Sequence, residues 1–101
     1  MLYNQETTKN IAEFLKALGN EYRLQIVNLL ISGEKNVSQL NEHVKVSQPA
    51  LSQHLSKLRE AGIVDFRRDR RQIYYAISHP HVVSLLTVMA TFSPQQREQV
   101  A

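Results

Sequence analysis

Apolar side chains recur with the spacing of an α-helix along the first part of the chain. This pattern predicts four helices, at residues 7–18, 21–31, 37–44 and 48–61. The apolar stripe of the first helix is formed by Ile11, Phe14, Leu15 and Leu18. Gly19 follows that stripe, and we expect it to end the helix with a positive φ. Asn20 is then a suitable N-cap for the second helix.

Only three residues, 45–47, separate the third predicted helix from the fourth. Asn36 and Gln39 have the spacing of a capping box at the start of the third helix. Ser47 is a favourable N-cap for the fourth, in which Pro49 is tolerated because it falls in the first turn. The leucines of the fourth helix lie on one side, at Leu51, Leu55 and Leu58. Two helices joined by so short a turn, the second with a polar outer face, are typical of a helix-turn-helix.

After Gly62 the helical spacing gives way to strand-like segments. Residues 63–68 and 72–77 are rich in β-branched and aromatic types and flank a turn at 69–71, so they predict a hairpin. A last helix is expected at about 80–92, with Pro80 in its first turn. The sequence therefore predicts a mainly α fold with a small β-hairpin, a winged helix-turn-helix in the order ααααββα.

The polar face of the fourth helix carries side chains suited to the major groove of DNA. These side chains are small or form hydrogen bonds, so they can approach base edges closely. Gln can bond to adenine through two hydrogen bonds, and Ser can bond to a base or a phosphate. The residues expected to contact bases are Gln48, Ser52 and Gln53, and those expected to hold phosphates include Ser47, Ser56 and Lys57. For any one of these residues, the alternative is an ordinary solvated helix face.

Positive charge is concentrated in one segment, although the formal net charge is only +3 at pH 7. Residues 45–71 hold seven of the 12 Lys and Arg residues and three of the 9 acidic residues. Arginine suits phosphate contacts and narrow minor grooves, and the predicted hairpin tip is rich in it. We expect Arg68, Arg70 and Arg71 to clamp DNA; a solvated charged turn is the alternative.

The last predicted helix is apolar nearly all round, so it must be buried on more than one face. A chain of 101 residues has little to cover it. We therefore expect a homodimer through the first and last helices, with burial inside one subunit as the alternative. The expected interface residues are Ile11, Phe14, Leu85, Leu86, Met89 and Phe92. A two-fold dimer would present two fourth helices about 34 Å apart to a pseudo-palindromic site on DNA.

Composition excludes several classes of protein. The length predicts a single domain over residues 1–101, with 43% hydrophobic and 21% charged residues as in ordinary globular proteins. The absence of cysteine excludes disulfides, thiolate metal sites and a cysteine nucleophile. No apolar run approaches the roughly 20 residues of a membrane span, and the polar start lacks a signal peptide, so we expect a cytoplasmic protein with no membrane partner. No catalytic arrangement stands out, so we expect no enzyme activity and no cofactor.

Three segments resemble the ArsR/SmtB family of bacterial winged-helix repressors. They are LGNEYRLQIV at 18–27, VSQPALSQHLSKLREAGIV at 46–64 and YYAI at 74–77. The resemblance covers about residues 10–92. It implies a homodimer, built on the first and last helices, that leaves operator DNA when an inducer binds. It also suggests that His54 faces the DNA backbone, with burial against the hairpin as the alternative.

Within this family, the sequence is most similar to the branch of the haemolysin activator HlyU and the biofilm-growth repressor BigR. Members of that branch commonly sense reactive sulfur through a cysteine pair. These 101 residues contain no cysteine and cannot form that dithiol switch. The resemblance therefore implies a regulator without thiol-based sensing.

Some members of the family sense metals through a site on the last helix. This sequence has only the first half of that set of metal ligands. His79 and His81 occupy the first half, whereas the second half falls near Phe92 and Gln95, which do not bind metals. Two histidines without partners make a weak zinc site, so His79 could simply begin the helix and His81 could lie exposed or in the dimer interface. We expect a sequence-specific DNA-binding transcriptional regulator, a dimeric repressor. A metal-responsive repressor and a winged-helix protein-interaction module are the alternatives.

Overall fold

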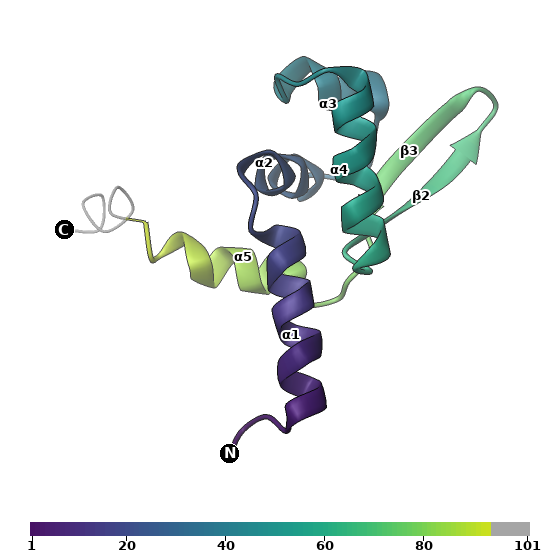
Figure 1. Ribbon diagram of the computed structural model, residues 1–101. Coiled ribbons are helices and arrows are strands. Elements are labelled where there is room, and N and C mark those ends of the chain that lie inside the picture. The colour runs from purple at the N-terminus through teal and green to yellow at the C-terminus, as the bar shows by residue number, and fades with distance from the viewer. Residues whose placement is uncertain (94–101) are drawn as a thin grey trace.

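The computed structural model describes residues 1–93, which form five helices and three strands (Figure 1). In chain order these are α1 (Gln5–Leu18), α2 (Glu21–Leu30), β1 (Lys35–Asn36), α3 (Val37–His43), α4 (Gln48–Glu60), β2 (Val64–Asp69), β3 (Gln72–Ile77) and α5 (Val82–Ala90). The predicted winged helix-turn-helix is confirmed: α3 and α4 form the helix-turn-helix, and β2 and β3 form the wing.

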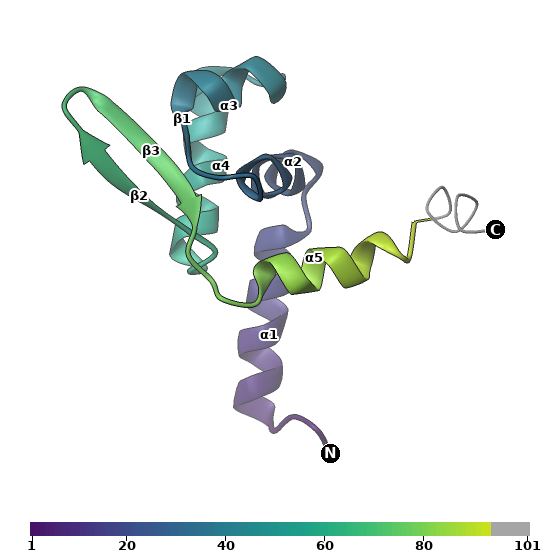
Figure 2. The same cartoon turned by 180° about the vertical axis from the view of Figure 1, so that it is seen from behind.

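Strand β1 was not predicted. It converts the expected hairpin into a three-stranded antiparallel sheet in the order β1-β3-β2, visible from behind in Figure 2. Lys35 pairs with Tyr75 and Asn36 pairs with Tyr74. A strand of two residues is too short to show an alternating pattern in the sequence. Its position still matters, because it ties the segment between α2 and α3 to the wing.

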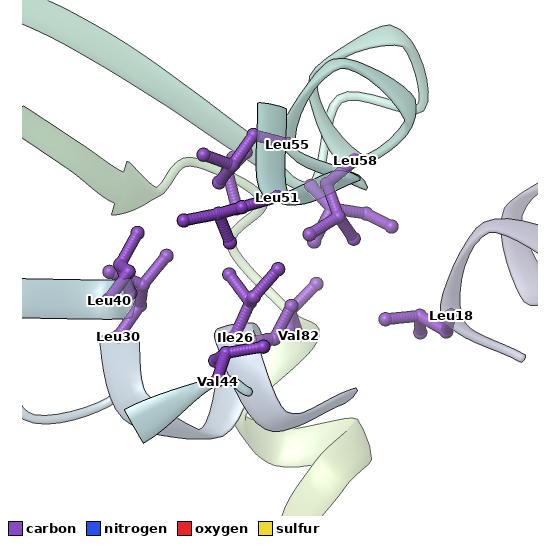
Figure 3. Close-up of a cluster of buried hydrophobic side chains, with 12 residues drawn as sticks. Leu18, Ile26, Leu30, Leu40, Val44, Leu51, Leu55, Leu58 and Val82 are labelled. Carbon is purple, nitrogen blue, oxygen red and sulfur yellow. The ribbon is translucent and has the colours of Figure 1, made fainter. Parts of the chain in front are cut away.

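The core lies between α2, α3, α4 and the base of the wing. Figure 3 shows Leu51, Leu55 and Leu58 of α4 pointing toward Ile26 of α2 and Val82 of α5. All five side chains are almost completely buried. Burial of each leucine contributes about 1.5–3 kcal/mol. This anchors α4 by its apolar side and leaves its polar side facing outward.

Side-chain caps fix where α2, α3 and α4 begin. Asn20 Oδ1 accepts hydrogen bonds from the N–H groups of Tyr22 and Arg23. The capping box of Asn36 and Gln39 is present in both directions, at 2.8 and 2.9 Å. The Ala50 N–H donates to Ser47 Oγ at 3.2 Å, so all three predicted caps are confirmed.

The ends of α1 differ from prediction. The helix starts at Gln5 because the Asn4 side chain accepts from the Thr7 N–H at 2.7 Å. The positive φ expected at Gly19 is wrong, since its φ is −78°. The Gly19 N–H bonds to the Lys16 carbonyl. Asn20, which follows, is extended and begins α2.

The last helix is shorter than predicted. Pro80 precedes it rather than lying in its first turn, because the His81 N–H donates to His79 Nδ1 and forms a separate turn. At the other end, the N–H groups of Thr91 and Phe92 bond to carbonyls three residues earlier. The α-helix proper therefore ends at Ala90. Within residues 1–93, no helix is long and apolar enough to cross a membrane.

Candidate nucleic-acid interface

The outer face of α4 is formed by the polar residues that the sequence singled out. Of the seven residues expected to contact DNA on this segment, six are exposed and His54 is half-buried; the exposed ones are Ser47, Gln48, Ser52, Gln53, Ser56 and Lys57. Ser47 caps the helix through Oγ as an acceptor, so its hydroxyl hydrogen remains available to a phosphate. No bulky apolar side chain interrupts this face, because Leu51, Leu55 and Leu58 point into the core.

His54 lies at the edge of this face, partly buried against α2. Its ring centroid is 5.8 Å from that of Tyr22, with the two planes at 34°. Burial lowers the pKa of His54 below its ordinary value of 6.5, and the nearby positive charge of Arg23 lowers it further. His54 therefore packs on α2 rather than on the hairpin, and its expected contact with the DNA backbone stays a prediction.

The wing projects beside α4 and ends in a tight turn of two residues (Figure 1). The predicted three-residue turn at 69–71 is wrong, because Asp69 pairs with Gln72 and belongs to β2. Arg70 has a φ of 59°, the left-handed region that glycine prefers, and it is the only such non-glycine residue among those described. A positive φ at the first of two loop residues alone is the pattern of a type II′ hairpin turn.

The arginines of the wing differ in what they contact. Arg67 is held by Glu34, with Arg67 Nε 2.9 Å from Glu34 Oε2, and this hydrogen bond lowers the pKa of Glu34. Arg68 lies 6.0 Å from the ring centroid of Phe66. Within residues 1–93, Arg68, Arg70 and Arg71 take part in no salt bridge. The three arginines expected to contact DNA are therefore exposed and free of ion pairs within the described residues.

Two side-chain pairs that shape this surface were not predicted from the sequence. The first is Glu34 with Arg67, 33 residues apart in the chain. The second is Arg59 at the end of α4, which bonds Asp65 at 3.2 Å and lies 4.2 Å over the Phe66 ring. The second pair links α4 to the base of the wing. The cluster of charges in this segment was its one signal in the sequence, and no local pattern marks the first pair.

The expected dimer residues occupy two kinds of environment. Phe14, Leu85 and Leu86 are partly buried against the core of their own subunit. Ile11 and Met89 are also half-buried, whereas Phe92 is 69% exposed. The neighbouring apolar residues Leu15 and Val88 are 47% and 57% exposed. Helices α1 and α5 cross each other away from the wing (Figure 2).

The histidines considered as metal ligands lie near each other at the start of α5. Their ring centroids are 6.0 Å apart, and His79 also stacks on Phe14 at 5.1 Å. Among residues 1–93, no three His, Cys, Asp or Glu side chains gather into a metal-binding group. Gln95, near the second half of the expected site, lies outside the described residues.

Comparison with known proteins places this architecture in a family. The model of the bacterial regulatory protein arsR family matches residues 20–65, which span α2 to the start of β2. The biofilm growth-associated repressor of Xylella fastidiosa is 35% identical over 95 residues, covering 94% of this chain and 83% of that protein. The transcriptional activator HlyU of Vibrio cholerae is 39% identical over 88 residues, covering 84% of this chain and 82% of that protein.

A solved structure extends the match to the fold. The homodimeric winged helix-turn-helix DNA-binding domain of a Mycobacterium bovis protein, solved by NMR in solution, superposes with a TM-score of 0.82. It is 27% identical, and the match covers 98% of this chain and 95% of that domain. Sequence and fold agree over nearly the whole length. The chain thus belongs to the ArsR family of winged helix-turn-helix transcriptional regulators.

Proposed function

We propose that the chain acts as a homodimeric repressor that binds a pseudo-palindromic operator in double-stranded DNA. The observation that carries this proposal is the outer face of α4. Its exposed residues from Gln48 to Lys57 are small or hydrogen-bonding, while its leucines hold the helix to the core. A helix with such a face fits the major groove, where side chains must approach base edges closely.

The exposed residues of α4 divide into two roles. Gln48, Ser52 and Gln53 would contact base edges and supply sequence preference. Phosphates would be held by Ser47, Ser56 and Lys57, with His54 at the edge of the same face. The free N–H groups at the start of α4 would add to phosphate binding.

The wing would supply a second, sequence-independent contact. Arg68, Arg70 and Arg71 are exposed and carry no ion pair in the described part of the chain. Guanidinium groups on a projecting loop suit phosphates or a narrow minor groove. Binding should therefore weaken steeply with salt, because each neutralised phosphate releases counterions.

Dimerisation would place two copies of α4 on one side of the duplex. Exposed apolar residues on α1 and just after α5, such as Leu15 and Phe92, are costly to leave in water. The homodimeric domain from Mycobacterium bovis has the same fold over almost the same length. The interface would include Ile11, Phe14, Leu85, Leu86, Met89 and Phe92. One domain, residues 1–101, would thus both bind DNA and pair, in the cytoplasm and without catalysis.

Two variants separate base contact from phosphate contact. Gln53→Ala should lose affinity for the operator while keeping its affinity for random duplex, because it removes a base contact. Arg70→Ala should weaken both duplexes similarly and lower the salt dependence. Fluorescence titrations of both duplexes at two salt concentrations measure these effects. Equal losses on operator and random DNA for Gln53→Ala would contradict its role in base contact.

A further inference from the structure

One arginine of the wing is held on three sides by its own subunit. The Arg67 guanidinium forms two hydrogen bonds with the carboxylate of Glu34. It also lies 3.7 Å from Asp69 and 4.7 Å from the ring centroid of Tyr74. Both the pKa of Glu34, which is lowered, and that of Arg67, which is raised, follow from this pairing. Arg67 therefore differs from Arg68, Arg70 and Arg71, which form no salt bridge within residues 1–93.

The Arg67 side chain spans the whole width of the sheet. Arg67 on the outer strand β2 is the direct cross-strand neighbour of Tyr74 on β3, and Tyr74 in turn pairs with Asn36 on β1. Glu34 comes immediately before β1. The guanidinium thus reaches over the Tyr74 ring to a residue on the far side of β3. It joins the wing to the segment that leads into the helix-turn-helix.

The ion pair of Arg67 and Glu34 lies where the wing begins to extend beyond the rest of the protein. Beyond the pair of Arg67 and Tyr74, the hairpin continues only through two more residue pairs to its tip, where β1 no longer accompanies it. The angle of the tip relative to α4 depends on how the strands are held below that point. A bidentate arginine–carboxylate pair is the kind of exposed ion pair whose geometry is specific enough to matter.

We propose that Glu34 and Arg67 are positioning residues, which set the angle of the wing so that Arg68, Arg70 and Arg71 meet the duplex while α4 occupies the major groove. Arg67 makes no phosphate contact of its own, because Glu34 engages its Nε and Nη2 and Asp69 lies beside its Nη1. This inference rests on the proposed function, since it assigns a role within DNA binding. It gives the acidic Glu34 a favourable effect on binding to a polyanion.

The sign of one substitution tests the proposal. Removing a negative charge near DNA should by itself strengthen binding. Glu34→Gln should instead weaken binding to every duplex by about two- to fivefold, the range expected for an exposed pair. The matched control is Glu42→Gln in α3, which removes an exposed carboxylate that forms no salt bridge within residues 1–93. The control should bind as tightly as wild type or more tightly.

A double-mutant cycle shows whether Arg67 acts through Glu34. If it does, Arg67→Gln and the double variant Glu34→Gln/Arg67→Gln should lose the same affinity as Glu34→Gln, and the salt dependence should stay that of wild type. A larger loss for Arg67→Gln, with the slope of log affinity against log salt reduced by about 0.9, would identify Arg67 as a phosphate contact and overturn the proposal. So would unchanged or tighter binding by Glu34→Gln.

A measurement without DNA keeps this inference separate from the proposed function. Residual dipolar couplings of backbone N–H groups report the orientation of β2 and β3 relative to the helices. In free Glu34→Gln protein the couplings of the wing should depart from the wild-type orientation, while those of the helices stay the same and show that the variant is folded. Identical wing couplings would overturn the inference. Absence of salt-dependent duplex binding by wild type would instead reject the proposed function.

Discussion

At the residue scale, the most unusual feature is the backbone of Arg70. A φ of 59° costs an L-residue roughly 1 kcal/mol or more, and glycine would adopt it without penalty. Strained residues persist at functional sites when the side chain is needed there. A charged side chain at the tip of a wing, in a position that favours glycine, is consistent with a role in contacting phosphates.

Arg70→Gly should separate stability from binding. The substitution relieves the strained φ, so the free energy of unfolding should stay the same or rise by up to about 1 kcal/mol. Duplex affinity should nevertheless fall, and the slope of log affinity against log salt should decrease by about 0.9. Urea unfolding and titrations at several salt concentrations provide both quantities.

Arg71→Gly is the matched control for this substitution. Arg71 has no positive φ, so glycine there adds unfolded-state entropy without relieving strain and should lower stability slightly. The role assigned to Arg70 is refuted if Arg70→Gly binds DNA as tightly as wild type with the same salt dependence.

At the scale of elements, α4 is fixed by its leucines on one side and by His54 against α2 on another. The contact between His54 and Tyr22 joins the expected DNA-contacting helix to its neighbour at a ring distance of 5.8 Å. The neutral form of His54 is the one that this contact favours, because burial and the positive charge of Arg23 both lower its pKa. The packing of α4 on α2 should therefore depend on pH.

The direction of that dependence follows from the lowered pKa. Above pH 6.5, His54 is neutral in the folded and unfolded states, and the contact is fully favourable. As the pH falls from 6.5 through the lower folded-state pKa, the unfolded chain binds the proton more readily, and stability declines. His54→Gln should remove this part of the decline. Urea unfolding of wild type and His54→Gln between pH 7 and pH 5 measures this difference. The same change of unfolding free energy with pH in both proteins, or an NMR titration midpoint of His54 at or above 6.5, would contradict the prediction.

Most of the elements could be predicted from the sequence because their signals are local. The leucine spacing in α4, the caps at Asn20, Asn36 and Ser47, and the alternating strands of the wing all act over a few residues. The features that could not be predicted are contacts between segments far apart in the chain. Such contacts form only in the folded structure, so no local sequence pattern marks them. Strand β1 forms only because Tyr74 and Tyr75 lie beside it, and Glu34 meets Arg67 only across that sheet.

At the scale of the whole molecule, the wing and the exposed apolar residues belong to different elements. The tip of the wing lies away from the crossing of α1 and α5 (Figure 1), whereas Lys57 near the end of α4 lines a cavity with Phe14 of α1. The exposed apolar side chains include Leu15 in α1, Val88 in α5 and Phe92 just after α5. From the breadth of the apolar surface on the last helix, the sequence predicted that a second subunit covers it, with burial inside one subunit as the alternative. A pair of subunits joined there would leave both α4 faces free for one duplex.

The most direct test is selection of binding sites from a pool of random double-stranded DNA by the full chain. A dimer that lays two α4 helices into successive major grooves should enrich an inverted repeat whose half-site centres are about 10 base pairs, or about 34 Å, apart. The Gln53→Ala variant should enrich the same repeat more weakly. Enrichment of a single asymmetric site, or of no sequence at all, would contradict the proposed dimeric binding.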